Sequence, residues 1–143
     1  MKKLRSLSQI YPLGILLVLT LPGAISAQSL IGTSSGTVIQ NEPTPHSYGL
    51  IMVLEGDSGS ISYPSLDCGG PVTFIRKKGA NYFYKEHMAY GTEVCIDGGI
   101  IKIKLLKNSI VWSWSGSGVT AQGSLTGNLS RQRKHKCGKQ KGI

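Results

Sequence analysis

The chain has 143 residues, and its 16 Lys and Arg outnumber its 7 Asp and Glu, which gives a net charge of +9. The excess is uneven, because residues 131–143 hold six basic residues, whereas residues 28–130 hold seven basic and seven acidic ones. A neutral body with a basic tail excludes a globally basic nucleic-acid-binding domain, so we expect no specific nucleic-acid binding. The body, about 100 residues long, suffices for one small domain.

The N-terminus has the features of a secretory signal peptide. Its first residues carry three positive charges, an apolar run follows from Leu13 to Leu21, and small residues end the segment at Ala27. This order predicts cleavage after Ala27 and export to the periplasm or the cell exterior. The apolar run is shorter than the about 20 residues that span a bilayer, so an uncleaved anchor is the weaker alternative. We expect three regions: a signal peptide (1–27), a β-barrel domain (28–130) and a disordered basic tail (131–143).

The body alternates apolar and polar residues with a period of two, and turn residues separate the alternating segments. This pattern predicts an all-β antiparallel meander without helices. Tyr48–Leu54 is apolar on both faces and predicts a fully buried strand. We expect eight strands that close into a small up-and-down, lipocalin-like barrel, because closure removes the exposed edges. The expected strands cover residues 36–40, 48–54, 60–63, 72–76, 81–90, 101–105, 110–114 and 119–125.

The body contains two cysteines, Cys68 and Cys95, and the tail contains Cys137. In an oxidising compartment two cysteines of a small domain are more often bridged than free, which makes a Cys68–Cys95 disulfide the expected pairing. A loop of this length would be stabilised by about 3 kcal/mol. Cys137 is then either free or available for a disulfide between two chains, although we expect a monomer.

Two motifs of the body point to a family. Residues 63–70 read YPSLDCGG, and residues 83–99 read FYKEHMAYGTEVCIDGG. The pair resembles a family of small exported bacterial domains with a YPSLxCGG loop and a later FxxExxxYGxxxCxxGG segment, and similar domains form the extracellular ends of some membrane-anchored bacterial kinases. The resemblance covers residues 32–127 and implies a small β-barrel with a Cys68–Cys95 bridge. It implies no particular activity, and it leaves out the basic tail.

Glu86 is the most informative polar residue, because it shares a strand face with several tyrosines. If that face points inward, burial raises the pKa of the Glu86 carboxyl unless hydrogen bonds compensate. Glu86 is then either a general acid or ligand anchor, or a structural residue bonded to tyrosine hydroxyls or to backbone N–H groups of the glycine loops; we favour the structural role. The candidate polar site comprises Glu86, Tyr63, Tyr90, Gly69 and Gly70, and the candidate ligand-lining residues are Trp112, Trp114, Tyr82 and Tyr84. For Trp112 and Trp114 we favour packing in the core over a ligand-lining role.

Other chemical motifs are weaker. The segment Gly56–Ser60 is similar to the nucleophile segment of trypsin-like proteases, but Asp-Ser-Gly is also typical of a hairpin turn, which we favour. The histidines are too scattered for a zinc site, so we expect no metal, no cofactor and no catalytic residue. The tail Arg131–Lys141 is either a solvated end or a contact for a polyanion or an anionic membrane.

These observations leave three hypotheses about function. The first is an exported, non-enzymatic binding module for a protein or a cell-envelope component. An inhibitor of a hydrolytic enzyme would be one example of such a module. The second is a lipocalin-like carrier of a small apolar ligand, which requires a cavity of a few hundred Å³. The third is a small hydrolase built on Glu86, which requires a cleft that joins this carboxyl to a second titratable group.

Overall fold

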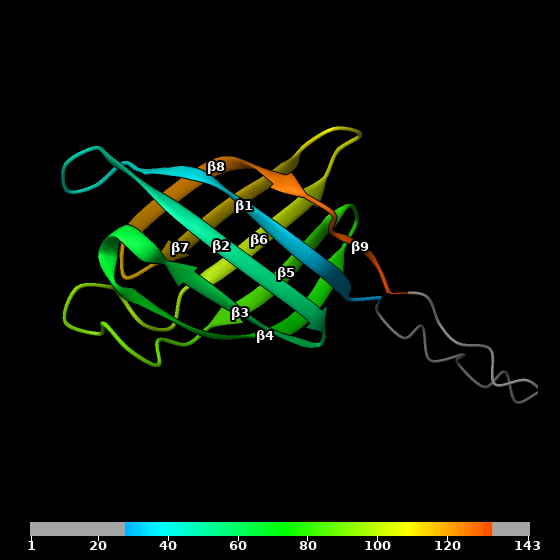
Figure 1. Cartoon of the computed structure of the whole chain (residues 1–143), viewed down its shortest axis with the longest axis horizontal. Helices are drawn as coiled ribbons and strands as arrows, with labels where there is room; N and C mark the ends of the chain where they lie inside the picture. The colour runs from blue at the N-terminus through cyan, green and yellow to red at the C-terminus, as the bar shows by residue number, and fades with distance from the viewer. Residues whose placement is uncertain (1–27, 133–143) are drawn as a thin grey trace, which may run out of the picture.

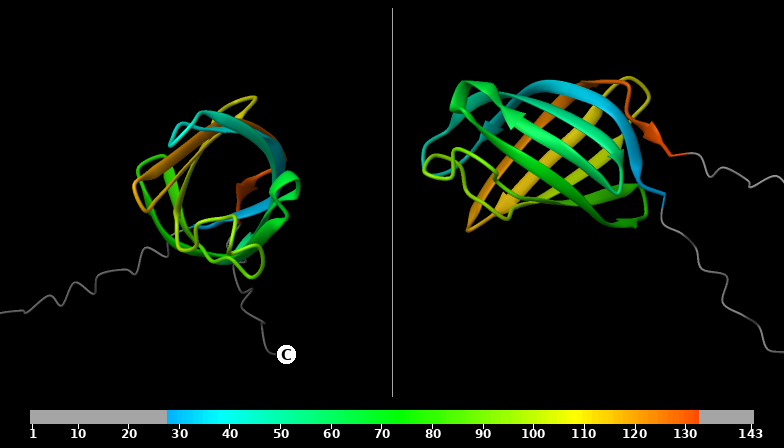
Figure 2. Two further views of the ribbon diagram at one scale, coloured as in Figure 1. Left: turned by 90° about the vertical axis from the view of Figure 1, so that its left-hand side faces the viewer. Right: turned by 60° about the horizontal axis from the view of Figure 1, so that its bottom comes forward.

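Eight antiparallel strands close into a barrel because the first strand, β1, pairs with both the second and the eighth (Figures 1 and 2). The computed structural model describes residues 28–132. The closed eight-stranded meander confirms the fold class expected from the sequence. The signal peptide expected over residues 1–27, Cys137 and most of the basic tail lie outside the described residues. Among the described residues, no helix is long and apolar enough to cross a membrane.

Each strand pairs with its neighbours in chain order. The first strand, β1, closes the barrel: it pairs with β2 from Leu30↔Gly56 to Gln40↔His46, and with β8 from Ser34↔Gly127 to Gln40↔Ala121. A short strand, β9, follows β8 and pairs with the start of β1. The elements are β1 (Leu30–Gln40), β2 (His46–Gly56), β3 (Ser58–Tyr63), η1 (Pro64–Leu66), β4 (Cys68–Lys78), β5 (Asn81–Glu86), β6 (Ile100–Leu105), β7 (Ile110–Gly116), β8 (Val119–Gly127) and β9 (Ser130–Arg131).

Three expectations about the strands are corrected. The strand expected over 81–90 ends at Glu86, because the backbone of residues 87–90 leaves β6 and turns onto β4. The strand expected to be buried on both faces, Tyr48–Leu54, is buried on one face only, and Ile51 on its other face is 45% exposed. A 3-10 turn, η1, occupies Pro64–Leu66, where no helix was expected.

The ends of the barrel extend further than the sequence indicated. β1 begins at Leu30 rather than at residue 36, because its Gly- and Ser-rich first half still pairs with β2 along its whole length. At the C-terminal side, Arg131 pairs with Leu30, and the backbone N–H of Gln132 donates to the Ser29 carbonyl. The ordered barrel therefore includes two residues that were assigned to the tail.

The interior of the barrel is filled by side chains rather than by a channel. Trp112, Tyr84 and Leu125 are fully buried, and aliphatic side chains from β2 and β6 pack against them. At one end, Leu30 is buried and its N–H donates to the Tyr84 hydroxyl at 2.9 Å. Both described ends of the chain lie at this end of the barrel, which we call the closed end (Figure 1). The opposite end carries the loops 41–45, 64–67, 87–99 and 117–118, and we call it the loop end.

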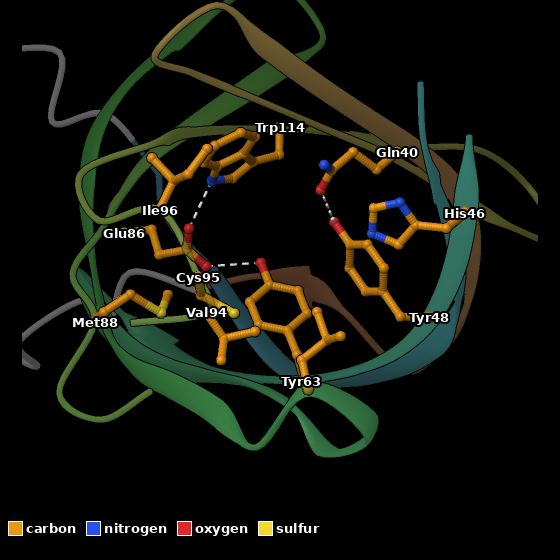
Figure 3. Close-up of a pocket in the computed structure, with 11 residues that line it drawn as sticks. Gln40, His46, Tyr48, Tyr63, Glu86, Met88, Val94, Cys95, Ile96 and Trp114 are labelled. Atoms are coloured by element: carbon orange, nitrogen blue, oxygen red, sulfur yellow. Dashed lines mark hydrogen bonds between the residues drawn. The ribbon is translucent and has the colours of Figure 1, made fainter. Parts of the chain in front are cut away.

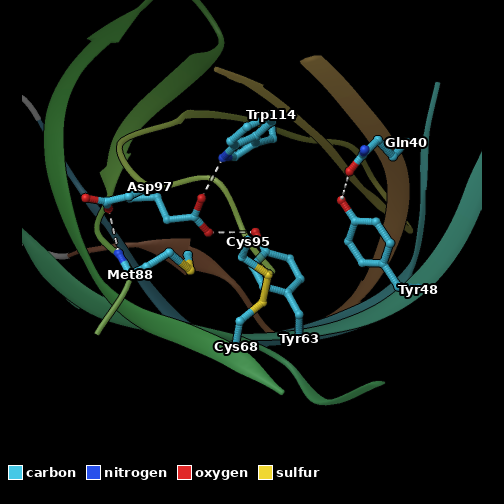
Figure 4. The surroundings of a disulfide bond; sticks show 9 residues. Gln40, Tyr48, Tyr63, Cys68, Met88, Cys95, Asp97 and Trp114 are labelled. Carbon is cyan, nitrogen blue, oxygen red and sulfur yellow. Dashed lines mark hydrogen bonds between the residues drawn. A yellow bond between two sulfur atoms is a disulfide. The ribbon is translucent and has the colours of Figure 1, made fainter. Parts of the chain in front are cut away.

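A disulfide joins Cys68 to Cys95 and confirms the expected bridge (Figure 4). It fastens the long β5–β6 loop, residues 87–99, to the first residue of β4, with 6.3 Å between the two Cα atoms. The same loop is held by backbone hydrogen bonds, because the Gly69 carbonyl accepts from the N–H groups of Ala89 and Tyr90 at 2.8 and 3.2 Å. The long loop at the loop end is therefore held in place by a disulfide and by backbone hydrogen bonds.

Candidate functional site

A cavity of about 160 Å³ opens at the loop end of the barrel (Figure 3). Its polar floor is Glu86, the last residue of β5, and its walls come from four different strands and from the β5–β6 loop. Aromatic rings supply much of the wall. The lining residues are Gln40, His46, Tyr48, Tyr63, Leu66, Glu86, Met88, Val94, Cys95, Ile96 and Trp114.

Two aromatic side chains fix the carboxylate of Glu86. The Tyr63 hydroxyl donates to Oε1 at 2.7 Å, and the Trp114 indole N–H donates to Oε2 at 2.5 Å (Figure 3). The backbone N–H of Glu86 donates to the Gly99 carbonyl at 2.9 Å. The side chain is 1% exposed, so both carboxylate oxygens are removed from bulk water and are held in one orientation.

Burial raises the pKa of the Glu86 carboxyl above its usual value, although the hydrogen bonds from Tyr63 and Trp114 oppose the shift and the nearby charge of Asp97 adds to it. The negative charge of Glu86 in turn acts on the tyrosines. Burial and this charge raise the pKa of Tyr48 to about 12, and burial, the charge and the direct hydrogen bond raise the pKa of Tyr63 further. Both hydroxyls therefore remain protonated, and the one on Tyr63 remains a donor, at neutral pH.

The glycines of the two motifs allow backbone segments to approach closely around this floor. A Cβ on Gly70 would lie 1.9 Å from the His87 carbonyl, and one on Gly69 would lie 2.5 Å from the Ile61 carbonyl. A Cβ on Gly99 would lie 1.9 Å from the indole nitrogen of Trp114, so the indole occupies the place that any side chain at residue 99 would take. These glycines contribute space rather than ligand contacts.

The structure brings part of the expected polar site together. Tyr63 contacts Glu86 directly, and Gly69 and Gly70 support the loop beside it. Tyr90 lies outside the cavity, 48% exposed, because β5 ends four residues before it. The hydrogen bond from Tyr63 agrees with the structural role favoured for Glu86, whereas the second donor is an indole rather than a glycine N–H.

Only one of the four expected ligand-lining residues lines the cavity. Trp114 does so, whereas Trp112, Tyr82 and Tyr84 are buried deeper in the barrel and belong to its core. Each of the four lies on an inward strand face, and Trp112 packs in the core, the role that the sequence favoured for it.

Several lining residues were absent from the expected site. His46 and Tyr48 share the inward face of β2 with Leu50, whereas the sequence indicated a strand that begins at Tyr48 and is apolar on both faces. Val94 and Ile96 lie in the β5–β6 loop, where no strand periodicity indicates a direction. Cys95 brings them to the cavity through its bridge to Cys68.

The protease-like motif is part of a tight connection between two strands. Ser58 begins β3 at the closed end, whereas His46 begins β2 at the loop end. An eleven-residue strand separates these ends by about 30 Å, so the histidine and the serine are far beyond contact. Within residues 28–132, no group of three or more His, Cys, Asp or Glu side chains lies close enough together to hold a metal ion.

Comparison with protein-family models found no match, and comparisons with curated proteins and with solved structures found no significant similarity. The fold and the cavity therefore define the class of the protein: a small, disulfide-bonded, eight-stranded antiparallel barrel with a carboxylate-floored pocket at one end.

Proposed function

We propose that the protein is an exported, non-enzymatic binding module that recognises its partner at the loop end of the barrel. The observation that carries this proposal is the cavity itself: the interior is otherwise filled, and the cavity at the loop end is floored by a single oriented carboxylate. Export rests on the sequence features of residues 1–27, and the disulfide is compatible with an oxidising compartment.

The rim of the cavity suits contact with a macromolecule. Val94, which lines the cavity, is 59% exposed, and it lies in the loop that the disulfide fastens. A loop ordered before binding loses less conformational entropy when a partner docks. The described chain ends lie at the closed end, opposite the loop end.

The other two hypotheses fit the site less well. A carrier of apolar ligands needs a pocket of about 300 Å³ or more, whereas this cavity is about 160 Å³ and has a charged floor. For the hydrolase, His46 does line the same cavity as Glu86. However, each oxygen of the Glu86 carboxylate already accepts a hydrogen bond from an aromatic side chain, which suits a fixed anchor better than a group that exchanges protons.

The test is affinity capture with the purified, immobilised protein from cell-envelope fractions and from host extract. Val94→Arg places a long charged side chain on the rim of the cavity, and Ile51→Arg places the same side chain on the outer face of β2. Both wild-type residues are exposed and apolar, so the variants are matched.

We expect the wild type and Ile51→Arg to retain the same partner, and Val94→Arg to lose it. Retention of the partner by Val94→Arg would contradict recognition at the loop end, whatever the behaviour of Ile51→Arg. Recovery of no partner, with co-purification of a lipid, would favour the carrier hypothesis instead.

A further inference from the structure

We propose that the cavity takes a small organic cation, an ammonium or guanidinium group that the carboxylate of Glu86 binds between aromatic walls. This inference rests on the proposed function, because it names the chemistry of the group that the loop end recognises. Five features support it: the charge of the site, its unused hydrogen-bonding capacity, its aromatic walls, the charge of the surrounding surface and the volume of the cavity.

The cavity is negatively charged when the Glu86 carboxyl is ionised. Glu86 is the one acidic residue among those that line it, and no lysine or arginine lines it. In the described part of the chain, the charged side chain that acts most clearly on Glu86 is Asp97, another acid. A buried carboxylate without a cationic partner is costly, and a bound cation would offset that cost.

The carboxylate also retains capacity to accept. An ionised carboxylate has about four lone-pair positions for hydrogen bonds, and here Tyr63 and Trp114 donate one bond each. Ammonium and guanidinium groups are donors without acceptors. They therefore complement the remaining positions, whereas an anionic group would be repelled.

The walls suit a cation as well. Tyr48, Tyr63 and Trp114 line the cavity around the carboxylate (Figure 3). The faces of such rings carry partial negative charge and attract organic cations, most strongly where water is excluded. The rings of Tyr48 and Tyr63 pack edge to face, 5.6 Å between centroids, which fixes the two walls relative to each other.

The surface charge of the barrel also favours a cation at the loop end. The loops of the loop end carry four exposed acids. The ammonium group of Lys85, which lies near them, donates a hydrogen bond to the Gly98 carbonyl. Several of the basic side chains gather instead at the turns of the closed end. This separation would steer a cation toward the cavity. The four acids are Glu42, Asp67, Glu93 and Asp97, and the bases at the closed end include Lys77, Lys78, Lys107 and Arg131.

The volume limits the size of the group. About 160 Å³ corresponds to roughly five water molecules at about 30 Å³ each. An ammonium, guanidinium or trimethylammonium head fits this space, whereas a complete lipid chain exceeds it. The cation would therefore be the projecting end of a larger partner, or a small free molecule.

The experiment is an NMR titration of the ¹⁵N-labelled protein, which follows the indole N–H of Trp114 because this group contacts Glu86 directly. The cationic probes are methylguanidinium, which can donate hydrogen bonds to the carboxylate, and choline, whose quaternary nitrogen carries no N–H and therefore tests the charge and the aromatic walls alone. The neutral analogues of similar shape are methylurea and 3,3-dimethyl-1-butanol. We expect saturable shifts of the Trp114 signal with the cations and at least tenfold weaker binding of the analogues. N-acetyl-lysine methylamide, compared with choline, distinguishes a protein side chain from a headgroup as the source.

Glu86→Gln should weaken binding of the cations at least tenfold, whereas Glu55→Gln at the closed end should leave it unchanged. If Glu86→Gln fails to fold, Tyr48→Leu removes one aromatic wall without touching the bonds of Glu86, and choline binding should fall several-fold.

Equal binding of cations and neutral analogues, or no response of Trp114 to any probe, would overturn the inference. Either result leaves the proposed function standing if Val94→Arg still loses the captured partner. Conversely, cation binding together with partner capture by Val94→Arg would support this inference and reject the loop end as the partner's docking surface.

Discussion

Removal of the Tyr63 hydroxyl, through Tyr63→Phe, tests whether the Glu86 floor also holds the barrel together. The substitution keeps the ring that packs against Tyr48 and deletes only the donor to Oε1 of Glu86, which lies 2.7 Å away. Glu86 is 1% exposed, so the only replacement donor is water in the cavity that this residue floors. The variant therefore leaves a buried carboxylate oxygen without its partner.

The expected loss follows from the kind of bond removed. A hydrogen bond to a charged group contributes about 1.5–3 kcal/mol, and its loss here leaves the accepting oxygen desolvated. We expect Tyr63→Phe to lower the free energy of unfolding by about 2 kcal/mol. In a domain of this size, that corresponds to a fall in melting temperature of about 10 °C.

The loss should also depend on pH. The hydrogen bond from Tyr63 lowers the pKa of Glu86, so its removal raises that pKa further. The difference between the wild type and Tyr63→Phe should be largest where Glu86 is ionised. It should shrink as the pH falls and the carboxyl becomes protonated in both proteins, because a neutral acid accepts a weaker bond.

Urea denaturation at several pH values, followed by tryptophan fluorescence, measures these differences. Tyr82→Phe is the matched control, because the Tyr82 hydroxyl is buried and has no hydrogen-bond partner among the described residues. We expect this control to change stability by less than about 0.5 kcal/mol. If Tyr63→Phe loses no more stability than Tyr82→Phe, the structural role of the Tyr63–Glu86 bond is refuted.

Three further predictions concern the same end of the barrel. Because burial raises the pKa of Glu86 in the folded state, the folded protein binds this proton more tightly than the unfolded chain does. The free energy of unfolding of the wild type should therefore rise, relative to that of Glu86→Gln, as the pH falls from the folded pKa to the unfolded pKa. A difference in unfolding free energy that does not change with pH, measured by urea denaturation, would contradict this. Replacement of Cys68 and Cys95 together by alanine should cost about 3 kcal/mol in urea denaturation, a loss that reductant should reproduce in the wild type, and a cost below about 1 kcal/mol would argue against the loop-closure reasoning. Gly99→Ala should displace the indole that donates to Glu86, which lowers the stability and shifts the NMR signal of the Trp114 indole N–H. Gly49→Ala should be tolerated, because the added Cβ lies 4.0 Å from its nearest neighbour. Equal effects of the two variants would contradict the packing argument.

The sequence predicted the directions of side chains well, because a strand alternates between two faces. The stripe Tyr82, Tyr84 and Glu86 points inward, an orientation that the sequence left open, and Trp112 and Trp114 point inward as expected. The same alternation places His46 and Tyr48 on the inward face of β2, although the sequence indicated a strand that is apolar on both faces. A period of two thus identifies what faces the interior.

The pattern is silent about position along the barrel axis. Tyr82 and Trp114 both face inward, yet the first is in the deep core and the second lines the cavity. The difference depends on the stagger between neighbouring strands, which the pairing of Tyr84 with Ile101 and of Ile101 with Trp114 sets. Register of this kind arises from tertiary pairing, so composition and periodicity of one strand do not contain it.

The end of β5 shows a second limit. Alternation continues through Met88 and Tyr90, but the backbone N–H of His87 donates to the Pro71 carbonyl of β4, and the chain leaves β6 at that point. The missing side chain of Gly70 permits this approach, since a Cβ there would overlap the His87 carbonyl. The strand therefore ends because of a glycine on its neighbour, a cause that lies sixteen residues away in the sequence.

The two motifs acquire a common physical meaning from this arrangement. A long loop loses considerable conformational entropy when it is ordered, and residues 87–99 are ordered here by the Cys68–Cys95 bridge, by the Gly69 backbone bonds and by the close approach at Gly70. That loop supplies Val94, Cys95 and Ile96 to the wall of the cavity. Because the ordering is completed during folding, a ligand at Glu86 would not have to bring it about. The cysteines and glycines thus prepare the site, and the chemistry of recognition falls to Glu86 and the aromatic rings around it.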